Sequence, residues 1–597
     1  MLGRLLLTAM QNLRRKTASL VLLLFFLTSC LPAGRIPLPP MEIPLRDLSG
    51  GQPTALPAAS ALPPSPPLSG YPASDPLTPT YSTPDQPIND YQTPTPTSQP
   101  YPLWIEPALP DALREAALAW NLPAASSAST ASLQLGFAAP YDKIASTWIY
   151  ALVAPFPTTL DGVTLADLEA AWNASSSGPL AGSPLWMTES TQRAFTALWG
   201  EAAPGAVQTA AAGELVEKMW QNQPAWGIVP FEALEPKLKV LTVDGQSPIR
   251  NDFDQAAYPL KINFSLVSAQ PIDLQLEKLQ LPATNRDPSQ LTVLLMTGVT
   301  ALVRATAAQM EIVGIDYPAW NIGDTLKAAD ITHISNEIPF YSGCPYPNPR
   351  QEGLVFCSNP KYIELLELVG TDIVELTGNH FQDYGSQATL NTLEMYKERN
   401  WPYYGGGADL ADSQKPALLE HNGNRLAFLG CNPIGPGYAL ATEDSPGAAP
   451  CGDYEWMKSE IARLKAEGYL VIATFQYEEY YQAEPTETHR RDFRAIAEAG
   501  ATIVSGSQAH VPQAMEFYNG AFIHYGLGNL FFDQMAPPSR REFLDRHIFY
   551  NGRYISTELI TAMLEDYARP RLMKAEERKT FLEAMFQASG WATLERP

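Results

Sequence analysis

The C-terminal half of the chain alternates short apolar runs with stretches of helical periodicity. From about Gln290 onward, most of these runs end in glycine or polar residues. The predicted strands are LTVLLMTGV, DITHIS, TDIVELTG, RLAFLGCN, YLVIATFQY, ATIVSGSQA and AFIHYGLG. Short apolar runs separated by helix-like segments are typical of α/β folds. Residues 288–597 are therefore predicted to form one α/β domain.

A second, smaller α/β domain is predicted for residues 101–287. TWIYALVAPF, AWGIVPFEAL and KLKVLTVDG have the character of strands, whereas TLADLEAAW and GELVEKMWQ carry apolar residues at helical spacing. Two globular regions agree with the length of 597 residues, which is too great for a single hydrophobic core.

Residues 31–100 lack such periodicity and are dominated by Pro, Ser and Thr, as in PPSPPLSGYPASDPLTPTYSTPDQP. A segment of this composition cannot bury enough apolar surface to offset the entropy cost of ordering. We expect it to be a disordered, extended tether between the N-terminus and the globular regions.

The N-terminus has the features of an export signal. Basic residues precede the apolar run TASLVLLLFFLTSC, which is short for a membrane span but suits a signal-peptide core. LTSC resembles a bacterial lipobox, so residues 1–30 are predicted to be a lipoprotein signal peptide with Cys30 as the lipidated residue. An uncleaved N-terminal anchor is the alternative. Both place the protein outside the cytoplasm, attached to the bacterial cell membrane.

Export makes disulfides possible for the other four cysteines. Cys344 and Cys357 bracket one Pro-rich loop, and Cys431 and Cys451 bracket a Pro/Gly-rich one. Of the three possible connectivities, we favour these two local pairs. A zinc cluster is disfavoured because no pair has CxxC spacing.

The overall charge argues against a nucleic-acid partner. Sixty-three acidic and forty basic residues give a net charge of −23. Such a balance repels nucleic acid unless a basic patch intervenes, and the sequence contains no such patch.

Polar candidates gather where the predicted strands of residues 288–597 end. In order they are Gly298-Val299, Ser335-Asn336-Glu337, Gly378-Asn379-His380, Gln476, Gln508-Ala509-His510 and Gly528-Asn529. Each has an ordinary structural explanation, since Asn and Gly form turns and buried histidines often bond to carbonyls. Their repeated position favours a shared site, because open α/β sheets place sites at the carboxyl ends of their strands.

Three segments, LTGNHFQDYG, ADITHISNEIPF and GATIVSGSQAHVPQAMEFYNGAFIHYGLGNLFFDQ, resemble the CapA family of poly-γ-glutamate capsule biosynthesis proteins. The resemblance covers most of residues 290–535. It implies a four-layer α/β sandwich of the metallophosphoesterase type and an extracytoplasmic role in making or exporting an anionic polymer. The implied partners are that polymer and the capsule export machinery. Residues 101–287 resemble a type 2 periplasmic solute-binding domain, whose ligand the sequence leaves unknown.

The resemblance also assigns roles to residues. Related phosphoesterases hold two divalent cations with Asp, Asn and His at strand ends. Asn379 and His380 match the family's Asn-His element, with Asn379 as a metal ligand and His380 as a catalytic proton donor. Glu337 matches an acidic metal ligand, and His510 the last catalytic histidine. Further binding residues are expected at Asn336, Gln476, Gln508 and Asn529.

Departures from the family pattern put a dinuclear centre in doubt. Val299 replaces an aspartate, Gln476 and Gln508 replace histidines, and Ser335 replaces an asparagine. Amide oxygens are poor substitutes for imidazole as ligands of a transition metal. The sequence leaves room for one hard divalent cation held by Glu337, Asn379 and His510.

Three functions follow as hypotheses, and the question of catalysis stays open. The first is a lipid-anchored CapA-like protein acting in biosynthesis or export of poly-γ-glutamate or another surface polymer. The second is a non-catalytic extracytoplasmic binding protein for a polar ligand or glycan, because amides donate and accept hydrogen bonds at once. The third is a metal-dependent phosphoesterase with altered ligands.

Overall fold

The computed structural model describes residues 101–268 and 279–591. The predicted signal peptide, Cys30 and the Pro-rich tether lie outside the described residues. In the segments that are described, no helix has the length and apolar character needed to cross a membrane.

Residues 101–268 form a mixed nine-stranded sheet with helices packed against it, so this region is α/β as predicted. Its strands run in the order β1-β2-β9-β3-β7-β5-β6, and β8 pairs with both β3 and β4. The strands are β1 (Leu103–Ile105), β2 (Leu133–Phe137), β3 (Ile144–Pro155), β4 (Gly162–Val163), β5 (Leu185–Met187), β6 (Val207–Thr209), β7 (Trp226–Pro230), β8 (Leu238–Val243) and β9 (Lys261–Ser268). The helices are α2 (Asp111–Leu118), α3 (Leu165–Trp172), α4 (Glu189–Trp199) and α5 (Ala212–Gln221).

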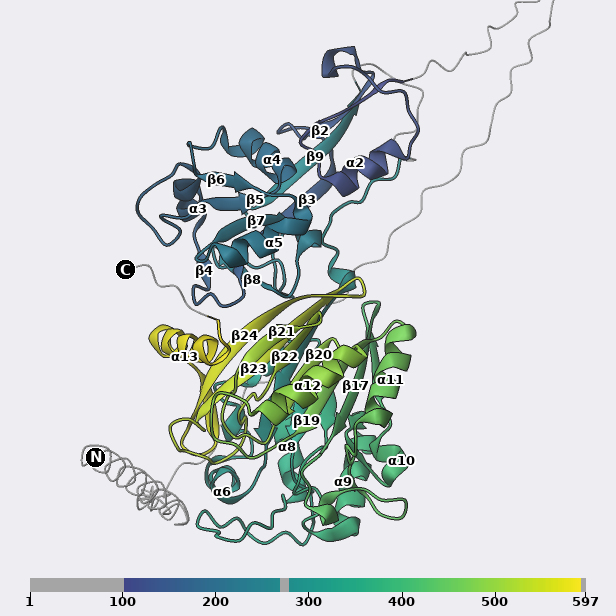
Figure 1. Ribbon diagram of the computed structural model, residues 1–597, viewed down its shortest axis with the longest axis vertical. Helices are drawn as coiled ribbons and strands as arrows, with labels where there is room; N and C mark the ends of the chain where they lie inside the picture. The colour runs from purple at the N-terminus through teal and green to yellow at the C-terminus, as the bar shows by residue number, and fades with distance from the viewer. Residues whose placement is uncertain (1–100, 269–278, 592–597) are drawn as a thin grey trace, which may run out of the picture. The chain divides into compact units, whose positions relative to one another are not determined.

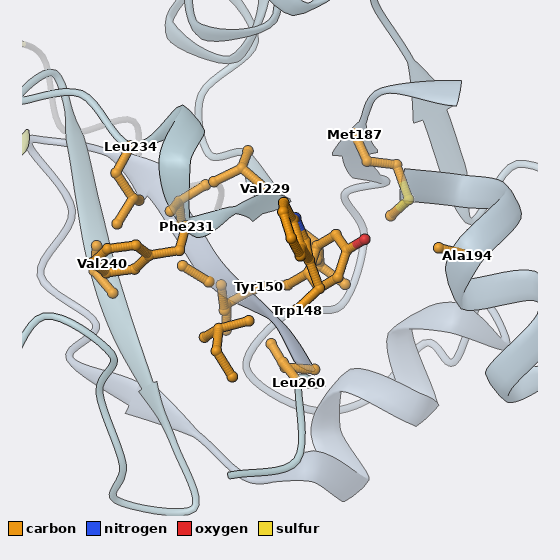
Figure 2. Packing of buried hydrophobic residues seen from close by; sticks show 14 of the residues in the cluster. Trp148, Tyr150, Met187, Ala194, Val229, Phe231, Leu234, Val240 and Leu260 are labelled. Atoms are coloured by element: carbon orange, nitrogen blue, oxygen red, sulfur yellow. The ribbon is translucent and has the colours of Figure 1, made fainter. Parts of the chain in front are cut away.

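The core of this region is built around β3, which is long enough to pair with β7, β8 and β9. Trp148 and Tyr150 are almost completely buried, and Figure 2 shows them among Met187, Val229 and Phe231. Large aromatic side chains of this kind supply much of the apolar area that stabilises a core.

The C-terminal region contains two larger sheets. One has the order β14-β13-β12-β10-β23-β24-β25, with β11 paired to β12, and the other has the order β16-β17-β19-β20-β22-β21. The first sheet comprises β10 (Leu291–Thr297), β11 (Val299–Thr300), β12 (Ile331–Asn336), β13 (Ile373–Glu375), β14 (Tyr403–Tyr404), β23 (Arg541–Tyr550), β24 (Arg553–Glu565) and β25 (Arg569–Leu572). The second comprises β16 (Ala417–His421), β17 (Asn424–Cys431), β19 (Leu470–Gln476), β20 (Ile503–Ser507), β21 (Met515–Tyr518) and β22 (Ala521–His524). A short pair, β15 (Gly406–Gly407) and β18 (Gly447–Ala448), lies apart from both.

The buried clusters show that this region has four layers. One cluster joins β10, β12 and β13 to β17, β19 and β22, so it lies between the sheets. A second cluster packs helices on the outer face of the first sheet, and a third packs α11 and α12 on the outer face of the other (Figure 1). The helices are α6 (Arg304–Val313), α7 (Gly323–Lys327), α8 (Ile363–Leu368), α9 (Gly385–Glu398), α10 (Leu410–Ser413), α11 (Glu455–Ala466), α12 (Glu487–Ala499) and α13 (Ala575–Ala588). The predicted four-layer α/β sandwich is confirmed.

All seven strands predicted for this region are present, but the hairpin of β23 and β24 was missed. Its sequence, REFLDRHIFY followed by RYISTELITAMLE, breaks the apolar pattern with charged residues. Several of these are paired rather than solvated. Asp545 bonds to His524 at 2.6 Å inside the core, and Arg546 bonds to Glu558 at 2.6 Å. Burial of paired charges is a tertiary effect that a one-dimensional pattern does not reveal.

Candidate functional site

Glycines bring the strand ends unusually close together. A Cβ on Gly378 would lie 2.4 Å from the carbonyl oxygen of Glu337, and one on Gly298 would lie 2.2 Å from that of Gly528. Contacts this short between a side chain and backbone are sterically forbidden, so only glycine permits the approach. The residues that follow these glycines are thereby gathered into one site.

The side-chain amide of Gln476 lies at the centre of this site. Its Nε2 lies within hydrogen-bond distance of three acceptors, Glu337 Oε1 at 3.2 Å, Asn379 Oδ1 at 2.8 Å and Gln508 Oε1, which share its two N–H groups. Ser507 Oγ lies 3.5 Å from Gln476 Oε1, so it can donate to the other end of the amide. Four of the predicted site residues therefore lie together: Gln476 contributes the nitrogen atom, and the other three contribute side-chain oxygens around it.

His380 lies at the edge of this cluster and is held by Asp383. Its Nδ1 is 2.7 Å from Asp383 Oδ2, and its ring packs edge-on against Phe356 at 4.8 Å between centroids. Burial opposes protonation, but the hydrogen bond to Asp383 and the negative charge of Glu337 outweigh it and raise the pKa of His380. No described residue bonds to Nε2, which leaves that atom for a ligand.

His510 is oriented in the same way by a neutral partner. Its Nδ1 is 2.8 Å from Asn529 Oδ1, an acceptor, so Nδ1 donates this hydrogen bond and Nε2 is directed away from Asn529. The ring lies 5.2 Å from that of Phe532 and 6.2 Å from that of Tyr481. Asn529 is completely buried, so it positions His510 and is not placed to touch a ligand itself.

Backbone strain marks the segment that carries two of these side chains. Gln508 has φ of 81° and His510 has φ of 54°, although neither is glycine. Such conformations cost about 1–3 kcal/mol each and persist where a site requires a particular side-chain direction. The strain therefore agrees with a functional role for this turn.

An arginine clamps two walls of the site. Arg304 makes a two-pronged ion pair with Asp533, including Nε to Oδ2 at 3.1 Å. Its guanidinium also lies 5.2 Å from the ring centre of Phe356 and 5.0 Å from that of Phe532. Phe356 packs against His380 and Phe532 against His510, so Arg304 contacts both of the rings that support the imidazoles.

Two disulfides fix the loops that surround the site, and both predicted pairings are confirmed. Cys344 is bonded to Cys357, and Cys431 to Cys451. The first bond anchors the residue next to Phe356. The second closes the loop that carries Tyr438, whose hydroxyl donates to Asp383 Oδ1 at 3.1 Å.

Not every predicted residue reaches the site. The structure places the Asn336 amide among the outer helices, where its Nδ2 donates to Ile338 O at 2.7 Å and to Tyr396 Oη at 2.8 Å. Sequence reasoning missed Asp383, Arg304 and Tyr438. The spacing of three residues between His380 and Asp383 was available as a signal; the other two depend on loops meeting in space.

The donor set does not fit the metal centre that related folds carry. Val299 is a buried aliphatic residue where a carboxylate would be needed. Gln476 directs N–H groups at the oxygens of Glu337, Asn379 and Gln508, which are the atoms a hard cation would need. Within residues 101–268 and 279–591, no group of three His, Cys, Asp or Glu side chains is arranged to hold a metal ion.

The substitution Gln476→Glu tests whether the Gln476 amide nitrogen prevents cation binding at this site. We expect wild-type protein to bind divalent cations substoichiometrically, because a donor nitrogen occupies the centre of the oxygens. In Gln476→Glu, an oxygen replaces that nitrogen and a second carboxylate faces Glu337, so affinity for Mn²⁺ or Ca²⁺ should rise. Mass spectrometry of metal content after equilibrium dialysis measures the difference. Equal, stoichiometric metal in both proteins would contradict it.

A second prediction concerns the protonation of His380. Asp383→Asn should lower the pKa of His380, because it removes the negatively charged hydrogen-bond acceptor that raises it. In the wild type the folded pKa lies above the unfolded value of 6.5, so protonation of His380 adds stability below that pH. This contribution is lost as pH rises through the folded pKa. NMR titration of the imidazole in both proteins checks the shift; an unchanged pKa would refute the role of Asp383.

Fold and site together define a metallophosphoesterase-like sandwich whose strand ends gather amide, imidazole and carboxylate side chains. Residues 293–534 match the family described as "Bacterial capsule synthesis protein PGA_cap". Residues 293–534 are therefore similar to the capsule-synthesis, or CapA, family, as the sequence motifs predicted.

Two curated relatives agree with this assignment. The "PGA biosynthesis protein CapA" of Bacillus subtilis (strain 168) is 32% identical over 198 residues, which cover 33% of this chain and 52% of the relative. The "Capsule biosynthesis protein CapA" of Bacillus anthracis is 26% identical over 258 residues, which cover 42% and 62%. The chain thus spans between half and two thirds of the length of these relatives.

A solved ABC-type phosphate transport receptor from Vibrio cholerae shares 11% identity with this chain. The match covers 30% of this chain and 91% of that one, with a TM-score of 0.26. A TM-score this low supports no argument, so the solute-binding character of residues 101–287 stays a prediction.

Proposed function

We propose that this protein acts outside the cytoplasm in the biosynthesis or export of a capsule polymer, and that its strand-end site binds a ligand without metal chemistry. Similarity of residues 293–534 to the capsule-synthesis family supports the first part. The observation that carries the second part is the Gln476 amide, which bonds to three oxygens that would otherwise be free for a cation. The lipidated Cys30 and membrane attachment are part of the proposal.

In this proposal the imidazoles of His380 and His510 are the groups that contact the ligand. Each is held through Nδ1, by Asp383 or Asn529, so each presents Nε2 in a fixed direction. His380, with its raised pKa, serves as a hydrogen-bond donor when protonated, whereas His510 serves as an acceptor. Such a pair orients a polar ligand that both donates and accepts hydrogen bonds.

Complementation of a deletion strain tests the function. His380→Ala should reduce the amount of surface polymer to the level of the deletion strain, while the protein remains present at wild-type abundance. Tyr141→Ala, which changes a fully exposed side chain in the N-terminal region, is the matched control and should restore the polymer completely. Wild-type polymer in the deletion strain would refute the capsule role. Activity that chelator abolishes and Mn²⁺ restores would refute metal-independent action.

A further inference from the structure

The loops around the strand-end site expose apolar and aromatic side chains toward solvent. Tyr438 is 58% exposed and Tyr481 43% exposed. The same loops expose further apolar and aromatic side chains, which are Ile434, Tyr480, Leu354, Val355 and Tyr346. These residues come from three loops, which follow β12, β17 and β19. We call this surface the aromatic rim.

The two central tyrosines of the aromatic rim are held in place rather than free. Tyr438 Oη donates to Asp383 Oδ1 at 3.1 Å, and Tyr481 Oη donates to Glu479 Oε1. A hydroxyl bonded to a carboxylate fixes the ring while its face remains exposed. Pre-ordered rings lose little entropy on binding, which makes them suitable stacking platforms.

Each platform adjoins one of the imidazoles. Asp383 joins Tyr438 to His380, because it accepts hydrogen bonds from both. Tyr481 lies 6.2 Å from the His510 ring. A ligand stacked on either ring would therefore be within reach of an imidazole Nε2 atom.

The charges of the site disfavour a polyanion. Three carboxylates belong to this part of the structure: Asp383 lies 2.7 Å from the His380 ring, Glu337 lies 3.2 Å from the Gln476 amide, and Glu479 accepts a hydrogen bond from Tyr481. Among the described residues, no lysine or arginine bonds to Glu337, Asn379, Gln476 or Gln508, and Arg304 is occupied by Asp533. Like charges repel at this range, and apart from His380 in its protonated form the described residues of the site offer no free cation to an anionic polymer.

We propose that the aromatic rim and the imidazoles of the strand-end site bind a neutral glycan chain. Sugar rings combine apolar C–H faces, which stack on exposed aromatic rings, with hydroxyl groups that donate and accept hydrogen bonds. Tyr438 and Tyr481 supply the first kind of contact, and Nε2 of His380 and of His510 the second. This inference deepens the proposed function, because it names the class of molecule that the same site takes during capsule assembly.

Titration calorimetry on the full chain tests the inference with three probes: chitotetraose, maltotetraose and poly-γ-glutamate. At least one neutral tetrasaccharide should bind, and poly-γ-glutamate should not. Tyr438→Ala and Tyr481→Ala should each weaken that binding about fivefold or more, since each removes one stacking face. Tyr438→Phe, which keeps the ring, should retain most of the affinity, and Tyr141→Ala should retain all of it.

Three outcomes would overturn the inference: no heat with either tetrasaccharide, binding that the tyrosine variants leave unchanged, or preferential binding of poly-γ-glutamate. The last would leave the capsule function intact, because it would identify the polymer itself as the ligand. Conversely, the calorimetry could show glycan binding that depends on Tyr438 and Tyr481, while deletion of the gene leaves surface polymer unchanged. That combination would refute the proposed capsule function but not the glycan inference.

Discussion

Gly378→Ala should lower the free energy of unfolding by about 3 kcal/mol and abolish ligand binding at the strand-end site. The added Cβ would lie 2.4 Å from Glu337 O and 2.8 Å from Glu337 Cα, so the clash is with backbone and no rotamer can relieve it. The chain must move either β13 or the segment after β12. Both movements separate Asn379 from Glu337, which the Gln476 amide now joins.

Denaturant titration and binding calorimetry on the same samples check this prediction. Gly213→Ala is the matched control: Gly213 lies in α5, a Cβ there meets no atom within 4 Å, and alanine favours the helix. It should leave binding unchanged and stability equal or slightly higher. A Gly378→Ala protein with wild-type stability would show that the close approach of the strand ends is not required.

Arg304→Met should destabilise the C-terminal domain by about 3 kcal/mol, because it leaves the Asp533 carboxylate buried and unpaired. The Asp533 side chain is only 6% exposed and depends on Arg304 for its ion pair. The substitution also removes the cation between Phe356 and Phe532. We therefore expect weaker ligand binding as well as lower stability.

A double-mutant cycle separates the two effects. Asp533→Leu added to Arg304→Met should recover much of the stability, since no unpaired charge remains, while binding stays weak. Arg193→Ala is the control for removal of a surface ion pair: Arg193 and Glu189 are largely exposed, and the loss should be within about 0.5 kcal/mol. An equal loss of stability in Arg304→Met and Arg193→Ala would contradict the structural role of the Arg304–Asp533 ion pair.

Much of the C-terminal fold was predictable because its strands are buried on both faces. Runs such as Leu291–Thr297 and Leu470–Gln476 are almost entirely buried, so their sequences are continuous apolar stretches that need no knowledge of their neighbours. The turn residues after them also carried a signal, since Asn379 and His380 do lie at a strand end beside Glu337. Local pairing of the cysteines was predictable for a similar reason, because each pair brackets a short loop.

The direction of individual side chains was not predictable in this way. Asn336 precedes Glu337 by one residue, yet its amide points among the helices, because successive residues of a strand face opposite sides. Likewise, Gln476 was predicted to be a ligand-binding residue, but the two N–H groups of its amide are already shared among three neighbouring oxygens. This hydrogen bonding becomes visible only in the tertiary structure, where the ends of β12, β13, β19 and β20 lie next to one another.

The sequence by itself predicted seven strands of the C-terminal region, the two α/β regions, the disulfide pairs and the similarity of residues 293–534 to the capsule-synthesis family. These are properties of local apolar periodicity and of motifs that are contiguous in the chain. The tertiary structure alone decided how Arg304, Asp383 and Tyr438 contribute to the site, and why Asp545 is tolerated inside a core. Such roles arise from contacts between segments far apart in sequence, where the energy of a charge or amide depends on the partners that folding brings to it.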